Sequence, residues 1–159
     1  MKLNRMHIVA VILGLVGVGA FAPMAFGSPP SGFTPTPLVV ADLDRAVDLN
    51  SDGVTFKTNR PTDVSVQKVV IDARGSSGWH HHPGIVIVAV KSGRVTVRDE
   101  NCDKTRYGIG LRNGDVFIES GDEPGKVTSW KGATIYATFV APSADPPAFR
   151  IEDDPPSCA

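Results

Sequence analysis

The sequence has few aromatic residues and no long run of charges of one sign. Phe, Trp and Tyr make up only 7% of the 159 residues, and the formal net charge is −1. Because no stretch of Lys and Arg could form the positive stripe that nucleic-acid binding needs, we expect no nucleic-acid partner. The 16 glycines and 13 prolines supply many turns, which favours short strands over long helices. The first expectation is therefore an all-β fold.

Long apolar runs are also rare, and the one long enough to act at a membrane lies at the N-terminus. Lys2 and Arg5 precede an uncharged stretch over residues 8–26, and small residues stand before a cleavage site after Gly27. This layout predicts a signal peptide over residues 1–27 and a secreted or periplasmic protein. An uncleaved membrane anchor is the alternative, but proline and glycines interrupt the stretch. No later segment could span a bilayer, so we expect no stable membrane insertion after cleavage.

Cysteine is limited to two residues, Cys102 and Cys158, and both lie in the predicted exported part. Export places them where a disulfide bond can form and persist. The bond would pin the Pro-rich C-terminal extension, residues 145–159, against the domain. The alternative is a reactive or metal-binding thiol pair, which lacks a close C-x-x-C spacing or a nearby His.

Alternating and β-branched runs separated by turns fill the middle of the chain. The clearest runs are residues 64–71, 85–90, 94–98, 116–119 and 134–140. About eight short strands of this kind fit a β-barrel or jelly roll in one domain, over residues 38–144. Residues 28–37 are rich in Pro and predict a flexible arm, because Pro removes backbone hydrogen-bond donors.

Three of the four histidines are consecutive: His80, His81 and His82. In an extended chain successive side chains alternate, so His80 and His82 share one face and His81 lies on the other. The Cα atoms of His80 and His82 would lie about 7 Å apart, and two imidazoles at this spacing can bind one metal ion. The alternative is an exposed His-rich turn that titrates near neutral pH. Spacing alone leaves both interpretations open.

The segment around these histidines resembles a known motif. It reads Gly-Trp-His-His-His-Pro-Gly over residues 78–84, followed by an apolar strand and a Ser-Gly turn. It is similar to the first motif of the cupin superfamily, and above all to small secreted cupin-domain proteins with a Gly-Trp-His-x-His-Pro-Gly motif. The resemblance implies a single-domain cupin-like β-barrel, or jelly roll, with His80 and His82 as metal ligands. Val86 stands where the family motif carries its Glu ligand, and Ile87 stands at the motif's alternative spacing, so this ligand is absent.

The same resemblance implies a cofactor and partners. The cofactor would be a divalent transition metal such as Zn, Mn, Fe, Ni or Cu, and a small-molecule ligand would occupy the barrel. Proteins of the superfamily often form dimers, so a homodimer is an implied assembly of this chain.

The second half of the family's metal site has no histidine here. Gly114-Asp115 and the strand after it resemble the family's second turn and strand, but the loop over residues 120–126 contains no His. Glu123 is the nearest carboxylate, and carboxylates can ligate Zn, Mn or Fe, so Glu123 is the predicted third ligand. The alternative is that this loop is only a solvated turn.

Two functions follow from these patterns. The first is a secreted cupin that binds a divalent metal and a small ligand, with Trp79, Val86, Val88 and Phe117 lining the cavity. Ordinary core packing is the alternative for those four residues. The second function is a non-catalytic ligand-binding or structural cupin that has lost its metal centre. The sequence assigns no catalytic residue and leaves open whether the protein is an enzyme.

Overall fold

Every regular element of the described chain is a β-strand. The computed structural model describes residues 28–159, and the predicted signal peptide, residues 1–27, lies outside this range. The strands are β1 (Ser31–Leu43), β2 (Val47–Ser51), β3 (Val54–Thr58), β4 (Thr62–Ser76), β5 (His80–His81), β6 (Ile85–Gly93), β7 (Val95–Arg98), β8 (Lys104–Tyr107), β9 (Val116–Glu119), β10 (Lys126–Ser129), β11 (Ala133–Pro142) and β12 (Ile151–Glu152). The all-β prediction is confirmed.

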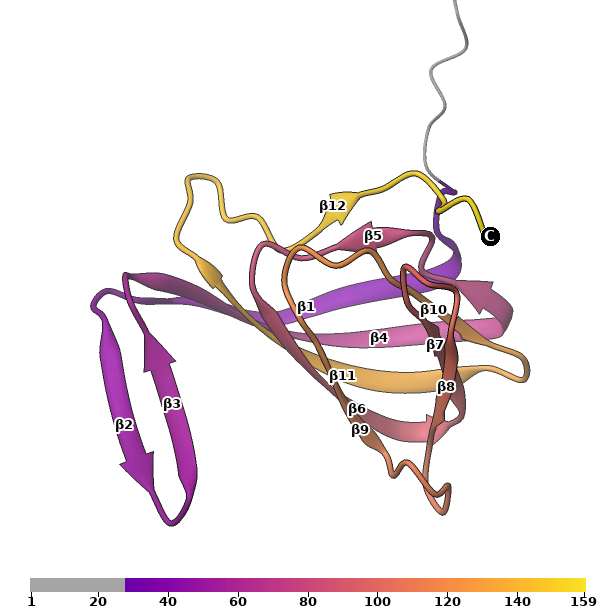
Figure 1. The fold of residues 1–159 in the computed structure, drawn as a ribbon, viewed down its shortest axis with the longest axis horizontal. Helices are drawn as coiled ribbons and strands as arrows, with labels where there is room; N and C mark the ends of the chain where they lie inside the picture. Colours follow the sequence, from indigo (N-terminus) through magenta and orange to yellow (C-terminus); the bar gives the residue numbers. More distant parts are fainter. Residues whose placement is uncertain (1–27) are drawn as a thin grey trace, which may run out of the picture.

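One large antiparallel sheet forms a nearly closed barrel (Figure 1). Its strand order is β8-β7-β10-β4-β11-β6-β9, and β1 pairs with β4 beside this path. The burial of β6 alternates over residues 85–90, with Val86, Val88 and Val90 buried and Ile85 and Ile87 exposed. Side chains on the inner face of the curved sheet therefore fill the barrel, as expected for strands with one buried face.

The core lies inside this barrel and is built mainly from valine, isoleucine and phenylalanine. Its buried members include Val69, Ile71, Val95, Val127, Ile135 and Phe139. Trp79 is fully buried, and the ammonium nitrogen of Lys126 lies 5.0 Å from the centroid of its ring. The β-branched residues of the sequence therefore supply both the strands and the packed interior.

The predicted flexible arm over residues 28–37 is wrong for most of its length. Strand β1 begins at Ser31, and its residues pair with β4 in the register Pro35 to Val69 and Pro37 to Gln67. The prolines are tolerated because β1 pairs with β4 alone, so its other edge needs no backbone donors. Phe33 packs against the core and fixes the strand to the barrel.

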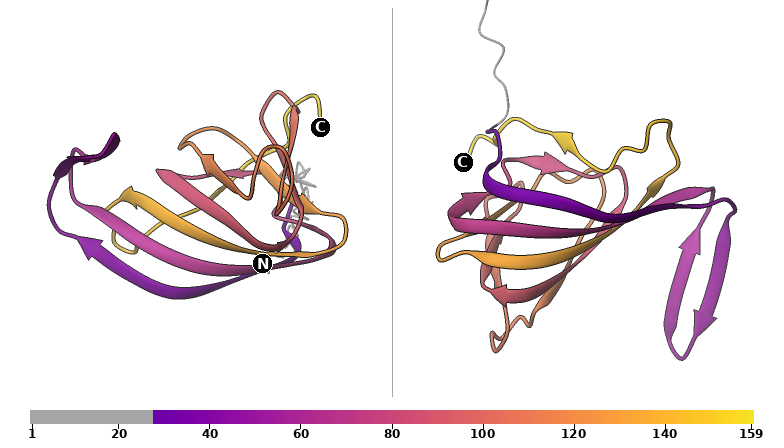
Figure 2. Two further views of the ribbon diagram at one scale, coloured as in Figure 1. Left: turned by 90° about the horizontal axis from the view of Figure 1, so that it is seen from below. Right: turned by 180° about the vertical axis from the view of Figure 1, so that it is seen from behind.

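Two segments extend from the barrel (Figure 2). The β2–β3 hairpin projects away from it, whereas the chain after β11 crosses the end of the barrel that carries β5. There β12 pairs with β5, and Cys158 forms the predicted disulfide bond with Cys102, with a Cα–Cα distance of 6.1 Å. The bond suggests an oxidising, exported compartment. Residues 28–159 include no helix able to cross a membrane.

Candidate metal centre

His80 and His82 lie on one face of the chain, as their spacing predicts. His80 is 5% exposed and His82 is 6% exposed, and their ring centroids are 4.8 Å apart. His81 points the other way, and its Nδ1 lies 2.8 Å from Asp153 Oδ2. The alternation of an extended strand thus directs two imidazoles toward the barrel and the third toward the C-terminal segment.

Glu119 completes a cluster with these two histidines. It ends β9, and its Oε2 lies 3.3 Å from His82 Nε2. One donor atom from each of the three residues lies within 4.8 Å of the other two. No other group of three or more His, Cys, Asp or Glu donors gathers in this way within residues 28–159.

The predicted third ligand, Glu123, does not join this cluster. It is exposed in the loop after β9, and it accepts a hydrogen bond from the hydroxyl of Ser120. It lies at the rim of a small hollow that His80 and His82 also border. The position of Glu119 follows from strand alternation, because Phe117 is buried and a residue two positions further along shares its face. That alternation was the sequence signal for Glu119.

Hydrogen bonds to backbone carbonyls determine the neutral tautomer of both rings. Nδ1 of His80 donates to the Gly78 carbonyl oxygen at 3.1 Å, and Nδ1 of His82 donates to the Phe149 carbonyl oxygen at 2.6 Å. A carbonyl can only accept, so Nδ1 carries a hydrogen in each ring, and in the neutral form of the ring the lone pair is on Nε2. Nε2 of His82 is buried and has no hydrogen-bond partner. The same arrangement orients histidines that bind metals in other proteins.

The surroundings keep His80 neutral. Burial, together with the nearby cation of Arg150 and the proximity of His82, lowers the pKa of His80 from 6.5 to about 4, against the opposing effects of the Glu119 carboxylate and the Gly78 carbonyl. At neutral pH the ring is therefore uncharged, which is the form that binds metal ions.

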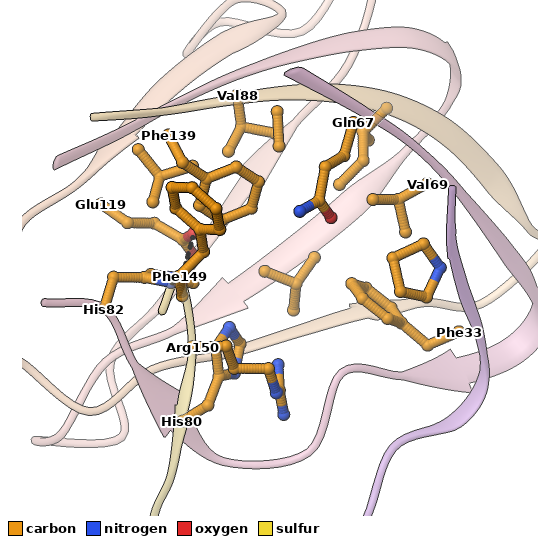
Figure 3. A pocket seen from close by; sticks show the side chains of 15 residues that line it. Phe33, Gln67, Val69, His80, His82, Val88, Glu119, Phe139, Phe149 and Arg150 are labelled. Atoms are coloured by element: carbon orange, nitrogen blue, oxygen red, sulfur yellow. Dashed lines mark hydrogen bonds and ion pairs between the residues drawn. The ribbon is translucent and has the colours of Figure 1, made fainter. Parts of the chain in front are cut away.

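A small cavity adjoins the cluster inside the barrel (Figure 3). Its volume is about 80 Å³, and most of its lining is apolar. The residues that line it are Phe33, Pro35, Gln67, Val69, His80, His82, Val86, Val88, Glu119, Val127, Ile135, Ala137, Phe139, Phe149 and Arg150. Of the four residues expected either to line a cavity or to pack in the core, Val86 and Val88 do line it. Trp79 and Phe117 are core residues that do not border it.

The C-terminal segment closes one side of this cavity. Phe149 and Arg150 both line it, and Arg150 Nη2 donates to the Ser77 carbonyl oxygen at 2.6 Å. Arg150 also pairs with Glu152, with Nε 2.6 Å from Oε1, and this hydrogen bond lowers the pKa of Glu152. The backbone nitrogen of Asp153 donates to the Trp79 carbonyl oxygen at 3.1 Å. The segment thus supplies a wall of the cavity as well as the hydrogen-bond acceptor of His82.

Comparison with known proteins identifies the fold. No family model and no curated protein sequence matches the chain. A cupin-2 domain protein from Rhodospirillum rubrum is similar in structure, with a TM-score of 0.50 and 12% identity over 79% of this chain and 68% of that one. A conserved protein of unknown function from Streptococcus pyogenes gives a TM-score of 0.46 and 16% identity, covering 64% of this chain and 79% of its own.

Part of a larger enzyme is also similar. Salicylate 1,2-dioxygenase from Pseudaminobacter salicylatoxidans gives a TM-score of 0.41 and 16% identity. The match covers 47% of this chain and only 20% of the enzyme's length. The all-β barrel and its similarity to the cupin-2 domain show a cupin jelly-roll fold.

Proposed function

We propose that this protein is an exported cupin that binds a divalent transition metal through His80, His82 and Glu119. The observation that carries this proposal is the buried, unpartnered Nε2 of His82, which lies beside the Glu119 carboxylate and the ring of His80. A buried polar atom without a partner is costly. A metal ion would supply the missing partner for that nitrogen and would neutralise the carboxylate.

The donor set favours transition metals over Ca²⁺ or Mg²⁺. Two imidazole nitrogens and one carboxylate oxygen suit Zn, Mn, Fe, Ni or Cu, whereas Ca²⁺ and Mg²⁺ prefer oxygen ligands alone. Three protein ligands leave coordination positions open to a small molecule. When bound, such an ion supplies Lewis-acid chemistry and, if it is redox-active, electron transfer.

The cavity limits the ligand to a small one. Its volume of about 80 Å³ is well below the roughly 300–1,000 Å³ typical of pockets for larger ligands. Val86, Val88 and Phe139 provide apolar contacts, and Arg150 provides one cation at the wall. We therefore propose a small, mainly apolar ligand that reaches the metal through this cavity.

A second candidate function is a binding module without a metal. The distance of 3.3 Å between His82 Nε2 and Glu119 Oε2 supports it, because protonation of His82 would turn this contact into a direct ion pair. In that case the barrel would keep its pocket but would have no metal chemistry.

Metal content separates these two functions. Residues 28–159, purified without a His tag and incubated with Mn, Fe, Zn, Ni or Cu, should retain about one equivalent of one metal after dialysis. The His80→Ala/His82→Ala variant and the Glu119→Gln variant should lose it. The His81→Ala variant is the matched control, because it removes a histidine outside the cluster, and it should keep the metal. Absence of metal from the unmodified chain would favour the binding module.

Export is a separate part of the proposal. The disulfide bond between Cys102 and Cys158 supports an oxidising compartment, and the signal-peptide pattern over residues 1–27 supports the route. Mass spectrometry of the protein from its native cells should find an N-terminus at Ser28. An intact Met1 in the mature protein would contradict cleavage.

A further inference from the structure

The outer face of strands β7, β8 and β10 carries a row of positive charges. Arg98 on β7 is the cross-strand partner of both Lys104 on β8 and Lys126 on β10. Their side chains point outward, because the alternate residues Val97 and Val127 pack against the core. Neighbouring strands lie about 4.8 Å apart, so the three cations follow one another across about 10 Å of the sheet. We define these three residues as the cationic row.

The cations of the row form no ion pair within the described part of the chain, although Arg98 also borders the hollow that contains Asp99 and Glu123. None of the ion pairs among residues 28–159 includes Arg98, Lys104 or Lys126. Like charges placed directly opposite on adjacent strands destabilise a sheet. Consistent with this, burial and the charge of Arg98 lower the pKa of Lys126. The protein keeps an unfavourable arrangement that a bound anion would relieve.

Two adjoining hollows lie along this face. Their volumes are about 530 and 640 Å³, and both are bordered by Thr96, Arg106 and Trp130. Seven of the 16 Lys and Arg residues of the chain line them, and no Asp or Glu does. This concentration stands out in a chain whose formal net charge is −1. The hollows lie on the outside of the barrel, and none of the residues that line the metal-site cavity borders them.

An exposed aromatic ring stands between the hollows. Trp130 is 72% exposed, and the guanidinium carbon of Arg74 lies 5.0 Å from its ring centroid. Exposure of so large an apolar ring is unfavourable in water, and rings of this kind are enriched where proteins bind partners. Trp130 therefore offers a flat apolar surface next to the two positively charged hollows, which together form one groove.

We propose that the cationic row and Trp130 form a binding site for an acidic polysaccharide, a polymer of sugar rings that carry carboxylate or sulfate groups. A single small anion could not contact cations spread over about 10 Å, whereas a chain with repeated charges could. The apolar face of a sugar ring can pack on Trp130, and the hydroxyl groups of Thr96 and Thr128 border the groove. A disulfide-bonded protein outside the cytosol would meet such polymers more readily than nucleic acids.

Binding to defined polymers tests this proposal. Residues 28–159 would be titrated at low salt with heparin, which carries sulfates, and with polygalacturonate, which carries carboxylates only. Neutral dextran is the control polymer. At least one acidic polymer should bind, dextran should not, and the affinity should fall as salt is raised, because bound cations are released from the polymer. The comparison of heparin with polygalacturonate identifies the anionic group.

Matched charge variants locate the site. The test variant is Arg98→Gln/Lys104→Gln, and the control variant is Lys68→Gln/Lys91→Gln. Each removes two positive charges, but Lys68 and Lys91 do not border the two hollows. The first variant should bind at least about tenfold more weakly, and the second less than about twofold. If the first variant does not fold, Trp130→Ala serves instead, since this side chain is exposed and should still contribute to binding.

Three results would overturn the proposal. The first is that neither acidic polymer binds at low salt, and the second is an equal loss of affinity in both charge variants. The third result is tighter binding of single-stranded DNA or of phosphatidylglycerol vesicles than of either polymer through the same residues, which would assign the site to a different class of partner.

Discussion

Val86 and Glu119 lie directly opposite each other on the paired strands β6 and β9. Residues that are opposite in an antiparallel pair have side chains on the same face, and both side chains line the barrel cavity. Val86 occupies the position where the cupin motif carries its Glu ligand. In the proposed metal centre, Glu119 would therefore supply from the neighbouring strand the carboxylate that β6 lacks, and its side chain lies in one donor cluster with the two histidines.

The carboxylate should be transferable between these two positions. Glu119→Ala should weaken metal binding by about tenfold or more, because it removes one of three ligands. Adding Val86→Glu in the same chain should restore much of the affinity, since the new carboxylate starts from the facing position on the same side of the sheet. Calorimetric titration with Zn²⁺ or Mn²⁺ would measure both variants.

Glu123→Gln is the matched control for this exchange. Its side chain lies in the loop beyond β9 and outside the donor cluster, so metal affinity should be unchanged. An equal loss of affinity in Glu123→Gln and Glu119→Ala would mean that the loop moves to place Glu123 on the metal.

Much of this site could be predicted from the sequence, because it depends on local periodicity. The spacing of His80 and His82 predicts their common face, and the strand patterns predict an all-β barrel. Glu119 was missed because the choice between it and Glu123 depends on where β9 ends, and strand ends are poorly defined by local pattern. Likewise, Pro-rich residues of β1 form a strand only because β4 provides a partner along one edge.

The cationic row shows a second limit of sequence analysis. Arg98, Lys104 and Lys126 are separated along the chain and form no basic run, so composition did not reveal them. Sheet pairing brings them together, and the register of three strands is not encoded in any one segment.

The disulfide bond should contribute strongly to stability. It joins residues 56 positions apart, and closing a loop of this length stabilises a fold by about 4 kcal/mol in the chain-entropy model. Urea unfolding of Cys102→Ser/Cys158→Ser should therefore show a free energy of unfolding lower by about this amount. A loss below about 1 kcal/mol would mean that the C-terminal segment is held by its other contacts.

The same disulfide variant should also bind metal more weakly. The bond anchors the C-terminal segment whose Phe149 carbonyl accepts the hydrogen bond from His82 Nδ1. Loss of such a supporting partner typically lowers metal affinity by about 10- to 100-fold. Unchanged Zn²⁺ affinity in a folded variant would show that pairing of β12 with β5 is enough to position His82.

Stability of the metal-free protein should fall in weak acid. The pKa of His80 is about 4 in the folded protein and 6.5 in the unfolded chain, so the unfolded chain binds more protons between these values. The free energy of unfolding should therefore be highest above pH 6.5. It should fall progressively, by about 3 kcal/mol in total, as the pH decreases to about 4. Urea unfolding in the presence of a chelator at several pH values measures it. His80→Gln should lack this part of the pH dependence, and an unchanged profile in that variant would assign it to other groups.

The position of a bound metal ion is the most direct test of the proposed centre. A crystal of residues 28–159 soaked with Zn²⁺ or Mn²⁺ would be measured by anomalous diffraction. The expected result is one strong peak at about 2.0–2.2 Å from Nε2 of His80, Nε2 of His82 and a carboxylate oxygen of Glu119. A peak between His81 and Asp153, or no peak inside the barrel, would contradict the proposed metal centre.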